Sequence, residues 1–463
     1  MTRFLTLLTL CSSLSALHAA APLDIGSRWE LFVDEYLVAQ KSGAALKLHD
    51  PIKREIVLTT DQPWEGMTCA YFSVIQDGGK VLMYYRGSSG GSDHSDAQVT
   101  CVAESTDGIH FTRPKLGLIE AGGTKDNNVI WRGVESHNFS PFLDTNPKTK
   151  PDERFKALGG VKQPGKNWHQ GETPGGLYAF ASADGIHWKK MKDTPVITKG
   201  AFDSQNLAFF DSTRGRYACF SRIFSNKVRA VQSCTSTDFL GWSDGVPHQY
   251  AEGVPMEHFY TSATVPCPTA PHLFLSFPKR FVTTRKKVPT HEGPGVSDAV
   301  FMSSRDGVHW DRPFLEAWVR PGPDLKNWTD RNNMTANGII IGEDEWSLYI
   351  SEHYRHPDHR IRRLTVRKQG FASMHADAKG GEFTTHPIKC GGKRLAINYA
   401  TSAAGSIRIE ALDETGKPVA TMPELYGDEF EASALDVSKL TGQTIQLRVT
   451  LKDADLYALR FAE

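Results

Sequence analysis

The heptapeptide STDGIHF, residues 105–111, decides how the rest of the chain is interpreted, because it recurs. The later copies are SADGIHW at 182–188, STDFLGW at 236–242 and SSRDGVHW at 303–310. In every copy a serine stands six residues before an aromatic residue, and three of the copies contain Asp-Gly. Asp-Gly between strands is a strong signal for a tight β-hairpin turn. The repeat therefore predicts one kind of hairpin four times, at intervals too long and irregular for a solenoid.

Each copy follows an alternating strand, and two further strands joined by a short turn lie upstream of that strand. Examples are AYFSVIQDGGKVLMYYRG at 70–87, NLAFFDSTRGRYACFSR at 206–222 and ATVPCPTAPHLFLSFPKR at 263–280. Four antiparallel strands per unit, repeated around an axis, predict a β-propeller. A fifth unit follows at 337–371, where Thr365 stands six residues before Phe371 but the Asp-Gly is lost.

The predicted architecture is all-β, a five-bladed β-propeller followed by a C-terminal β-sandwich. We assign residues 60–373 to the propeller and residues 374–463, whose alternating strands lack the repeat, to the sandwich. Residues 21–59 are expected to close the ring, through the strand WELFVDEYLV at 29–38. Residues 1–20 have the layout of a secretory signal peptide, with Arg3, a short apolar run and small residues at the end. We therefore expect a secreted or periplasmic protein.

Composition narrows the classes of partner. Lys+Arg and Asp+Glu both total 53, and this zero net charge argues against nucleic acid or a membrane surface. We find no apolar run after residue 20 that is long enough to span a bilayer. No C-x-x-C occurs, and SDHSD at 92–96 is interpreted as a solvated loop, so neither a metal nor a cofactor is predicted. Cys219 and Cys234 fall on adjacent predicted strands, where they either pair or remain single buried thiols.

Strand direction in a propeller separates two faces. The Asp-Gly turns share one face, where His110, His187 and His309 are interpreted as turn residues. The long variable loops share the other face with the starts of the innermost strands, and such loops usually carry function. Three carboxylates on that face are predicted to be catalytic: Asp203, Glu257 and Glu65. The residues predicted to bind substrate there are His137, Asn138, Arg222, His258, Tyr260, Arg280, Arg331, Asn332, Asn333 and His353, and Arg86 and Asp330 have equivalent positions.

Carboxylates that converge near an axis suit the cleavage of a glycosidic bond. One must be protonated to supply the leaving oxygen, and another must be ionised to attack the sugar or activate water. Burial and neighbouring acids raise one pKa, while arginines hold another low. Asp203 and Glu257 are the leading pair and Glu65 the third candidate, with acid and base not assigned. Salt bridges between blades are the alternative explanation for each acid taken singly.

Several stretches resemble known proteins, namely LFVDEYLV, FDSQNLAFFD, APHLFLSFPKRF, RPGPDLKNWTDRNNM, SEHY and LKDADLYALRF. They are similar to secreted family-32-like proteins of planctomycetes and verrucomicrobia. The architecture resembles the five-bladed glycoside hydrolases of the levanase/invertase and arabinanase superfamily, families 32 and 43. The resemblance implies a carbohydrate substrate and an axial site. The family 32 motifs W-[ML]-N-D-P, R-D-P and E-C are absent, so fructosidase activity is not implied.

Two functions remain open at this point: a secreted glycoside hydrolase, and a non-catalytic glycan-binding propeller. A phosphorylase is disfavoured because export removes the protein from cytosolic phosphate. A basic rim on the loops suggests an anionic glycan, although solvated loop charges explain it equally well. The rim residues are His94, His169, Arg285, Lys286, Lys287, His291, His356 and His359, and the aromatic residues proposed to stack on sugars are Trp64, Trp168, Tyr260 and Trp328.

Overall fold

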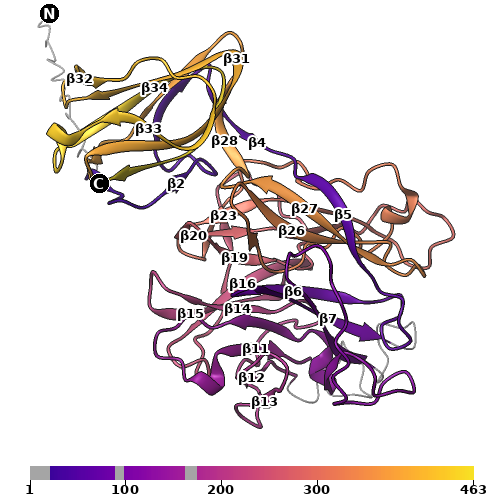
Figure 1. Cartoon of the computed structure of the whole chain (residues 1–463). Helices are drawn as coiled ribbons and strands as arrows, with labels where there is room; N and C mark the ends of the chain where they lie inside the picture. Colours follow the sequence, from indigo (N-terminus) through magenta and orange to yellow (C-terminus); the bar gives the residue numbers. More distant parts are fainter. Residues whose placement is uncertain (1–20, 89–97, 162–174) are drawn as a thin grey trace, which may run out of the picture.

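The computed structural model describes residues 21–88, 98–161 and 175–463, and it confirms a five-bladed propeller joined to a β-sandwich (Figure 1). Each blade is described from the axis outward. Blade one consists of β6 (Ala70–Asp77), β7 (Lys80–Ser88), β8 (Gln98–Ser105) and β9 (Val129–Arg132), and blade two of β10 (Ser140–Leu143), β11 (Phe155–Gly159), β12 (Tyr178–Ser182) and β13 (Lys189–Lys190). Blade three consists of β14 (Leu207–Asp211), β15 (Arg216–Ser225), β16 (Val228–Ser236) and β17 (Val246–Pro247), and blade four of β19 (Thr264–Cys267), β20 (Ala270–Ser276), β23 (Met302–Ser304) and β24 (His309–Asp311). Blade five consists of β25 (Ile340–Ile341), β26 (Glu345–Glu352), β27 (Arg360–Arg367) and β5 (Ile52–Thr59). Blade four also carries β18 (Gln249–Tyr250) and the hairpin of β21 (Lys279–Val282) and β22 (Val296–Ala299).

The repeated turn owes its sequence to local hydrogen bonds. The Ser105 hydroxyl accepts the backbone N–H of Gly108, and the Asp107 carboxylate accepts the backbone N–H groups of Ile109 and His110. The same pattern recurs in the other three copies. Among the described residues, the His110 ring bonds this local aspartate alone, at 2.7 Å, and it is exposed, as expected for a turn residue. In the third copy Phe239 takes the left-handed position, at φ 68°, that glycine takes in the others.

The strand that closes the ring is β5, which pairs with β27, and the expected closing strand at 29–38 lies elsewhere. Within 29–38, β2 (Glu30–Leu31) pairs with β34 (Thr444–Ala462) of the sandwich. The reason is that this segment is buried on both faces. Phe32 packs into the sandwich core, whereas Leu31 and Val33 pack against propeller residues. The outer position of blade five is free for β5 because the chain leaves the propeller after β27.

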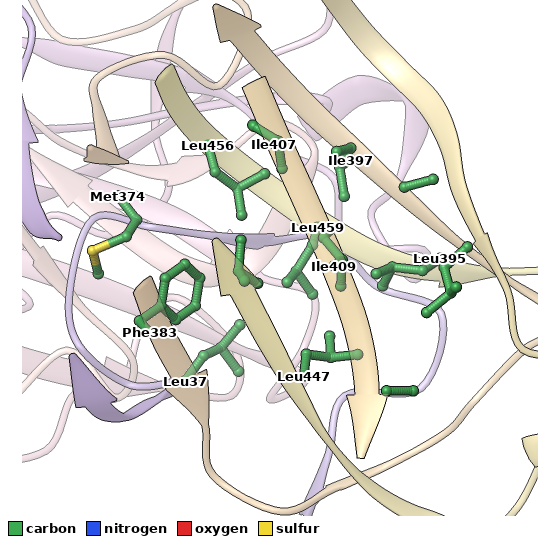
Figure 2. Packing of buried hydrophobic residues seen from close by; sticks show 14 of the residues in the cluster. Leu37, Met374, Phe383, Leu395, Ile397, Ile407, Ile409, Leu447, Leu456 and Leu459 are labelled. Atoms are coloured by element: carbon green, nitrogen blue, oxygen red, sulfur yellow. The ribbon is translucent and has the colours of Figure 1, made fainter. Parts of the chain in front are cut away.

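Both ends of the described chain build the sandwich (Figure 1). Its other strands are β1 (Leu23–Asp24), β3 (Val38–Ser42), β4 (Ala45–Leu48), β28 (Ala372–Ala376), β29 (Gly381–Thr385), β30 (Ile388–Lys389), β31 (Arg394–Leu412), β32 (Pro418–Thr421) and β33 (Asp428–Asp436). The long strands β31 and β34 pair along their length, with a register shift between Thr401 and Ser406. Leu395 and Ile409, from the two halves of β31, therefore meet in one apolar core (Figure 2).

The two domains also share a core. Phe371 is fully buried, and its ring lies 5.3 Å from Phe277 and 6.0 Å from Trp346 of the propeller. Ala396 and Ala458 of the sandwich belong to the same apolar cluster. This packing couples the sandwich mechanically to blades four and five.

The described part of the chain contains short 3₁₀ turns rather than long helices. These turns are η1 (Val134–His137), η2 (Pro151–Glu153), η3 (Leu325–Asn327) and η4 (Ser438–Leu440). None of the helices in residues 21–88, 98–161 and 175–463 has the length and apolar character needed to cross a membrane. Cys219 and Cys234 lie opposite each other on β15 and β16, and both are single buried thiols.

Candidate functional site

The starts of the inner strands converge on the carboxylate of Asp203, which precedes β14. His137, at the end of η1, places its Nε2 2.9 Å from Asp203 Oδ1. The hydroxyls of Tyr71 and Tyr260 donate to the two carboxylate oxygens at 3.4 and 3.5 Å. The Arg222 guanidinium lies 3.6 Å away. Blades one, two, three and four thus contribute directly to this contact set.

A second ring of residues comes mainly from the ends of the second strand of each blade. Arg86, near the end of β7, donates to the Tyr354 hydroxyl at 3.3 Å and lies at the same distance from His137 Nδ1. Arg331 donates to the same hydroxyl at 3.3 Å. Lys279 begins β21, and its Nζ lies 3.9 Å from the centroid of the Tyr260 ring. We call the whole group the axial cluster: Tyr71, Arg86, His137, Asp203, Arg222, Tyr260, Lys279, Arg331 and Tyr354.

Exposure differs sharply within the axial cluster. The Asp203 side chain is 31% exposed, whereas the Arg222 side chain is only 6% exposed. Arg86 and Lys279 are also buried. The accessible carboxylate of Asp203 therefore lies next to buried cationic side chains. Such cations act through a low-dielectric interior, where their field is screened less than at a free surface.

The surroundings of Asp203 keep it ionised. Burial would raise the pKa of this carboxyl, but the His137 hydrogen bond and the charges of Arg222 and Arg86 outweigh burial. The pKa of Asp203 is consequently held well below its usual range. An aspartate in this state can act as a nucleophile or a base, or stabilise positive charge, but it does not hold a proton to donate.

The surroundings of Lys279, in contrast, disfavour its charged form. Burial lowers the pKa of its amine to about 7, with Asp330 opposing that shift and Arg229 and Arg222 adding to it. The Nζ atom has no hydrogen-bond acceptor among the described residues. A buried amine without an acceptor is costly to keep. Residues that perturb one another in this way concentrate at functional sites.

Backbone strain marks the same region. Tyr71 and Arg331 have φ values of 57° and 63°, and His353, next to Tyr354, has φ 61°. The left-handed region disfavours residues with a side chain, at a cost of about 1–3 kcal/mol each. The folded structure therefore holds three large side chains at this mouth against local preference.

Glu65 and Glu257, predicted as catalytic, are not brought to Asp203. Glu65 is fully buried, and both of its oxygens accept from Arg113, at 2.7 and 2.9 Å. Glu257 is held between Arg280 at 3.1 Å and Arg312 at 2.6 Å. Both acids match the salt-bridge alternative considered for single carboxylates, so Asp203 is the one predicted acid of the axial cluster.

The predicted binding residues divide in a similar way. His137, Arg222, Tyr260 and Arg331 belong to the axial cluster, and His258 lies beside it, 3.4 Å from Arg229. The amides hold backbone segments together instead, as when Asn138 bonds the carbonyls of Gly160 and Phe202. Asn332 and Asn333 are likewise buried and bond neighbouring backbone groups.

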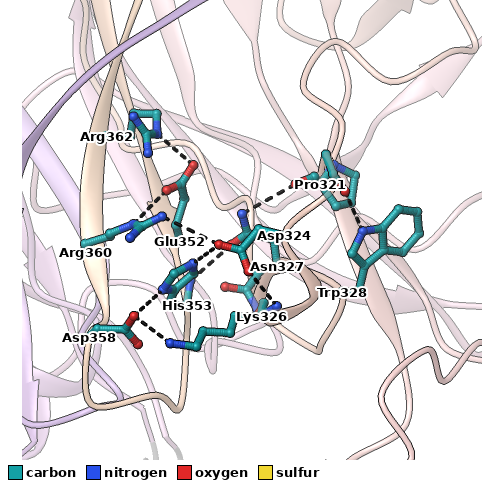
Figure 3. Close-up of polar contacts among 12 residues, drawn as sticks. Pro321, Asp324, Lys326, Asn327, Trp328, Glu352, His353, Asp358, Arg360 and Arg362 are labelled. Atoms are coloured by element: carbon teal, nitrogen blue, oxygen red, sulfur yellow. Dashed lines mark hydrogen bonds and ion pairs between the residues drawn. The ribbon is translucent and has the colours of Figure 1, made fainter.

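His353 forms a separate ion network with blade five (Figure 3). Its Nε2 lies 2.7 Å from Asp324, and its Nδ1 lies 2.9 Å from Asp358. Lys326 also bonds Asp358, at 2.7 Å, so this network ties the turn η3 to the end of β26. His353 therefore fixes the loop that precedes Arg331 and does not contact Asp203.

The sequence interpretation did not select Tyr71, Lys279 and Tyr354. A usable signal existed for two of them, because Lys279 stands next to the selected Arg280 and Tyr354 next to the selected His353, whereas no selected position adjoins Tyr71. His94, His169, Trp168 and the SDHSD segment lie outside the described residues. Within residues 21–88, 98–161 and 175–463, no cluster of three or more His, Cys, Asp or Glu side chains is arranged to hold a metal ion.

Known structures resemble this chain in fold at low identity. An N-acetylgalactosamine deacetylase from F. plautii, in complex with blood group B trisaccharide, is 13% identical, with a TM-score of 0.48 over 70% of this chain and 96% of that one. A β-1,2-mannobiose phosphorylase from Listeria innocua is 12% identical, with a TM-score of 0.47 over 70% and 98%. A Bombyx mori GH32 β-fructofuranosidase is 12% identical, with a TM-score of 0.44 over 90% and 94%. No protein-family model and no curated protein matches the chain. These values leave the function to be inferred from the residues of the site.

Proposed function

We propose that the protein is a glycosidase that acts on an anionic carbohydrate, sulfated or uronic, at the axial cluster. The charge balance around Asp203 carries this proposal. Arg86, Arg222 and Arg229 surround the site together with the Lys279 amine. In the described part of the chain, Asp203 and Asp330 are the carboxylates that face them. An anionic sugar group beside Asp203 would balance the remaining positive charge.

Asp203 would then supply the ionised group that glycosidic cleavage requires. A carboxylate held ionised can attack the anomeric carbon, activate water, or stabilise the positive charge that develops on the sugar. The hydroxyls of Tyr71 and Tyr260 stay protonated, because burial raises the pKa of both and brings that of Tyr260 to about 12. They are therefore positioned to hydrogen-bond a sugar hydroxyl next to the reacting bond.

A non-catalytic glycan-binding propeller is the second candidate. The observation that favours it is the placement of the other acids. In the described residues no second carboxylate contacts Asp203, and Glu65 and Glu257 are bound by arginines. A secreted or periplasmic location is also proposed, from the signal-like residues 1–20, which lie outside the described residues.

Product release from sulfated, uronic and neutral polysaccharides tests the proposal. The wild type is expected to cleave an anionic polymer, and Asp203→Asn is expected to lower kcat/KM by about a thousandfold or more. Asp244→Asn, an exposed aspartate beside Lys199, serves as the matched control. A preference for neutral polymers would reject the anionic substrate. Binding by wild type and Asp203→Asn alike, without turnover by either, would establish the second candidate instead.

A further inference from the structure

A pocket lies beside the axial cluster and has no role in the proposed chemistry. Its volume is about 410 Å³, and its walls are the hairpin of β21 and β22 and the segment 317–328. This size falls within the range of small-ligand pockets, about 300–1,000 Å³. Both walls belong to the face that carries the long loops, because the hairpin leads into the loop at 283–295 and the segment at 317–328 leads into blade five.

One strand separates this pocket from the axial cluster. Side chains alternate between the two faces of a strand. On β21, Lys279 and Phe281 face Tyr260, with the Phe281 ring centroid 6.3 Å from that of Tyr260. The alternate residues Arg280 and Val282 line the pocket. The pocket is therefore a direct neighbour of the axial cluster across the thickness of a single strand.

The pocket carries positive charge that the protein does not neutralise. Arg280 is compensated, because it bonds both oxygens of Asp298, at 2.9 and 2.7 Å, and Glu257 at 3.1 Å. Arg285 and Arg320 also line the pocket, and both are exposed. Neither forms an ion pair with any residue in the described part of the chain. The two free guanidinium groups stand at opposite walls, one on the hairpin side and one on the 317–328 side.

An aromatic side chain supplies the apolar part of the same pocket. Trp328 lines it, and the indole nitrogen donates to the Gly322 carbonyl at 2.7 Å, so the ring orientation is fixed from within its own loop (Figure 3). Because that bond satisfies the single polar atom of the indole, the rest of the ring is available for apolar contact. An apolar ring beside two cations fits a ligand with a C–H face and an anionic substituent.

We propose that this pocket is a second sugar subsite, which binds a sulfated or uronic unit of the same glycan whose neighbouring unit lies at Asp203. The choice of ligand rests on the proposed function. Arg285 and Arg320 bind the sulfate or carboxylate, and Trp328 packs against the ring of the sugar. Glu257 has a positioning role here, because with Asp298 it fixes Arg280 in the wall of the pocket.

Binding to Asp203→Asn protein at physiological ionic strength tests the subsite. The probes are dextran sulfate oligosaccharides, oligogalacturonates and unsulfated dextran oligosaccharides of equal length, measured by calorimetry. Arg285→Ala combined with Arg320→Ala is expected to weaken binding of at least one anionic probe about tenfold or more. Lys286→Ala combined with Lys287→Ala removes two positive charges from the loop that carries Arg285 but does not change the lining of the pocket, and it should change affinity by less than about threefold.

Equal losses in the two double variants would overturn the subsite, because bulk charge would then explain the affinity. Failure of every anionic probe to bind would overturn it as well. The dextran sulfate and oligogalacturonate arms distinguish a sulfated from a uronic unit. Trp328→Ala, with its fold checked by near-ultraviolet circular dichroism, should weaken the same probe. Binding through the pocket without product release by the wild type would retain the subsite and reject the glycosidase. Cleavage with equal KM in both double variants would retain the glycosidase and reject the subsite.

Discussion

Replacing Lys279 by methionine should stabilise the protein at neutral pH. Methionine has a similar length and fills the same space, but it brings no charge into the interior. In the folded state burial lowers the pKa of Lys279 to about 7, and its Nζ finds no acceptor among the described residues. In the unfolded chain the amine returns to its ordinary pKa of 10.5. Lys279 therefore opposes folding at every pH at which the unfolded amine is charged.

The size and pH dependence of this penalty follow from the two pKa values. Each pH unit between about 7 and 10.5 corresponds to about 1.4 kcal/mol, so the full penalty is roughly 5 kcal/mol. The penalty is complete below about pH 7, where the amine is charged in both states. It declines as pH rises and vanishes above about 10.5, where the amine is neutral in both states. The stability advantage of Lys279→Met should shrink in the same way.

Urea unfolding followed by tryptophan fluorescence between pH 6 and 10 measures this difference. Lys286→Met, at an exposed lysine, is the control and should track the wild type at every pH. Parallel stability curves for wild type and Lys279→Met would refute the reasoning, as would a variant that is less stable at pH 6. Activity should fall in the same variant that gains stability, because Lys279 contributes to the positive field at Asp203.

Four further outcomes are expected. Glu65→Gln should cost about 3–5 kcal/mol in thermal unfolding because it leaves the Arg113 guanidinium without its carboxylate, and an unchanged Tm would contradict this. Phe371→Ala should cost a similar amount, about 3–5 kcal/mol, and open the contact between the domains to limited proteolysis; protection equal to wild type would argue against a shared core. Asp203→Asn should be less stable than wild type at neutral pH, and the gap should begin to close as pH falls below about 4 and narrow further toward the lower pKa of the folded state, because a lowered pKa stabilises the folded state fully only above the unfolded value. Glu257→Gln should raise KM for an anionic glycan more than it lowers kcat, whereas a loss in kcat as large as that of Asp203→Asn would place Glu257 in the chemistry.

The blade pattern was predictable because it is local. Ser105 and Asp107 satisfy backbone groups within their own turn, so each copy of the repeat carries its structural information with it. The closing strand was not predictable from the same kind of pattern. Both 29–38 and 52–59 contain the apolar residues of a possible strand, and the choice between them depends on which cores bury Leu31, Phe32 and Val33.

The candidate site shows the same division between local and non-local information. Chain topology places Asp203, His137 and Tyr260 at one mouth, and the structure brings them into contact. Topology does not reveal which arginine reaches which acid. Arg113 approaches Glu65 from 48 residues away, beyond a repeated turn. Arg312 approaches Glu257 from 55 residues away. Such pairings depend on tertiary packing of side chains and leave no periodic trace in the sequence.

The strand β34 sets the order in which the molecule can be completed during synthesis. It pairs with β2, β28, β29, β30 and β31, and it follows every propeller strand in the sequence. The whole propeller is synthesised before this strand, so the blades can fold while the sandwich is still incomplete. During that time β2, which is synthesised early, lacks its partner strand. Deleting residues 444–463, which contain β34, would consequently expose β2 as well as the late strands β28 to β31, so segments far apart in the sequence would lose their partner together.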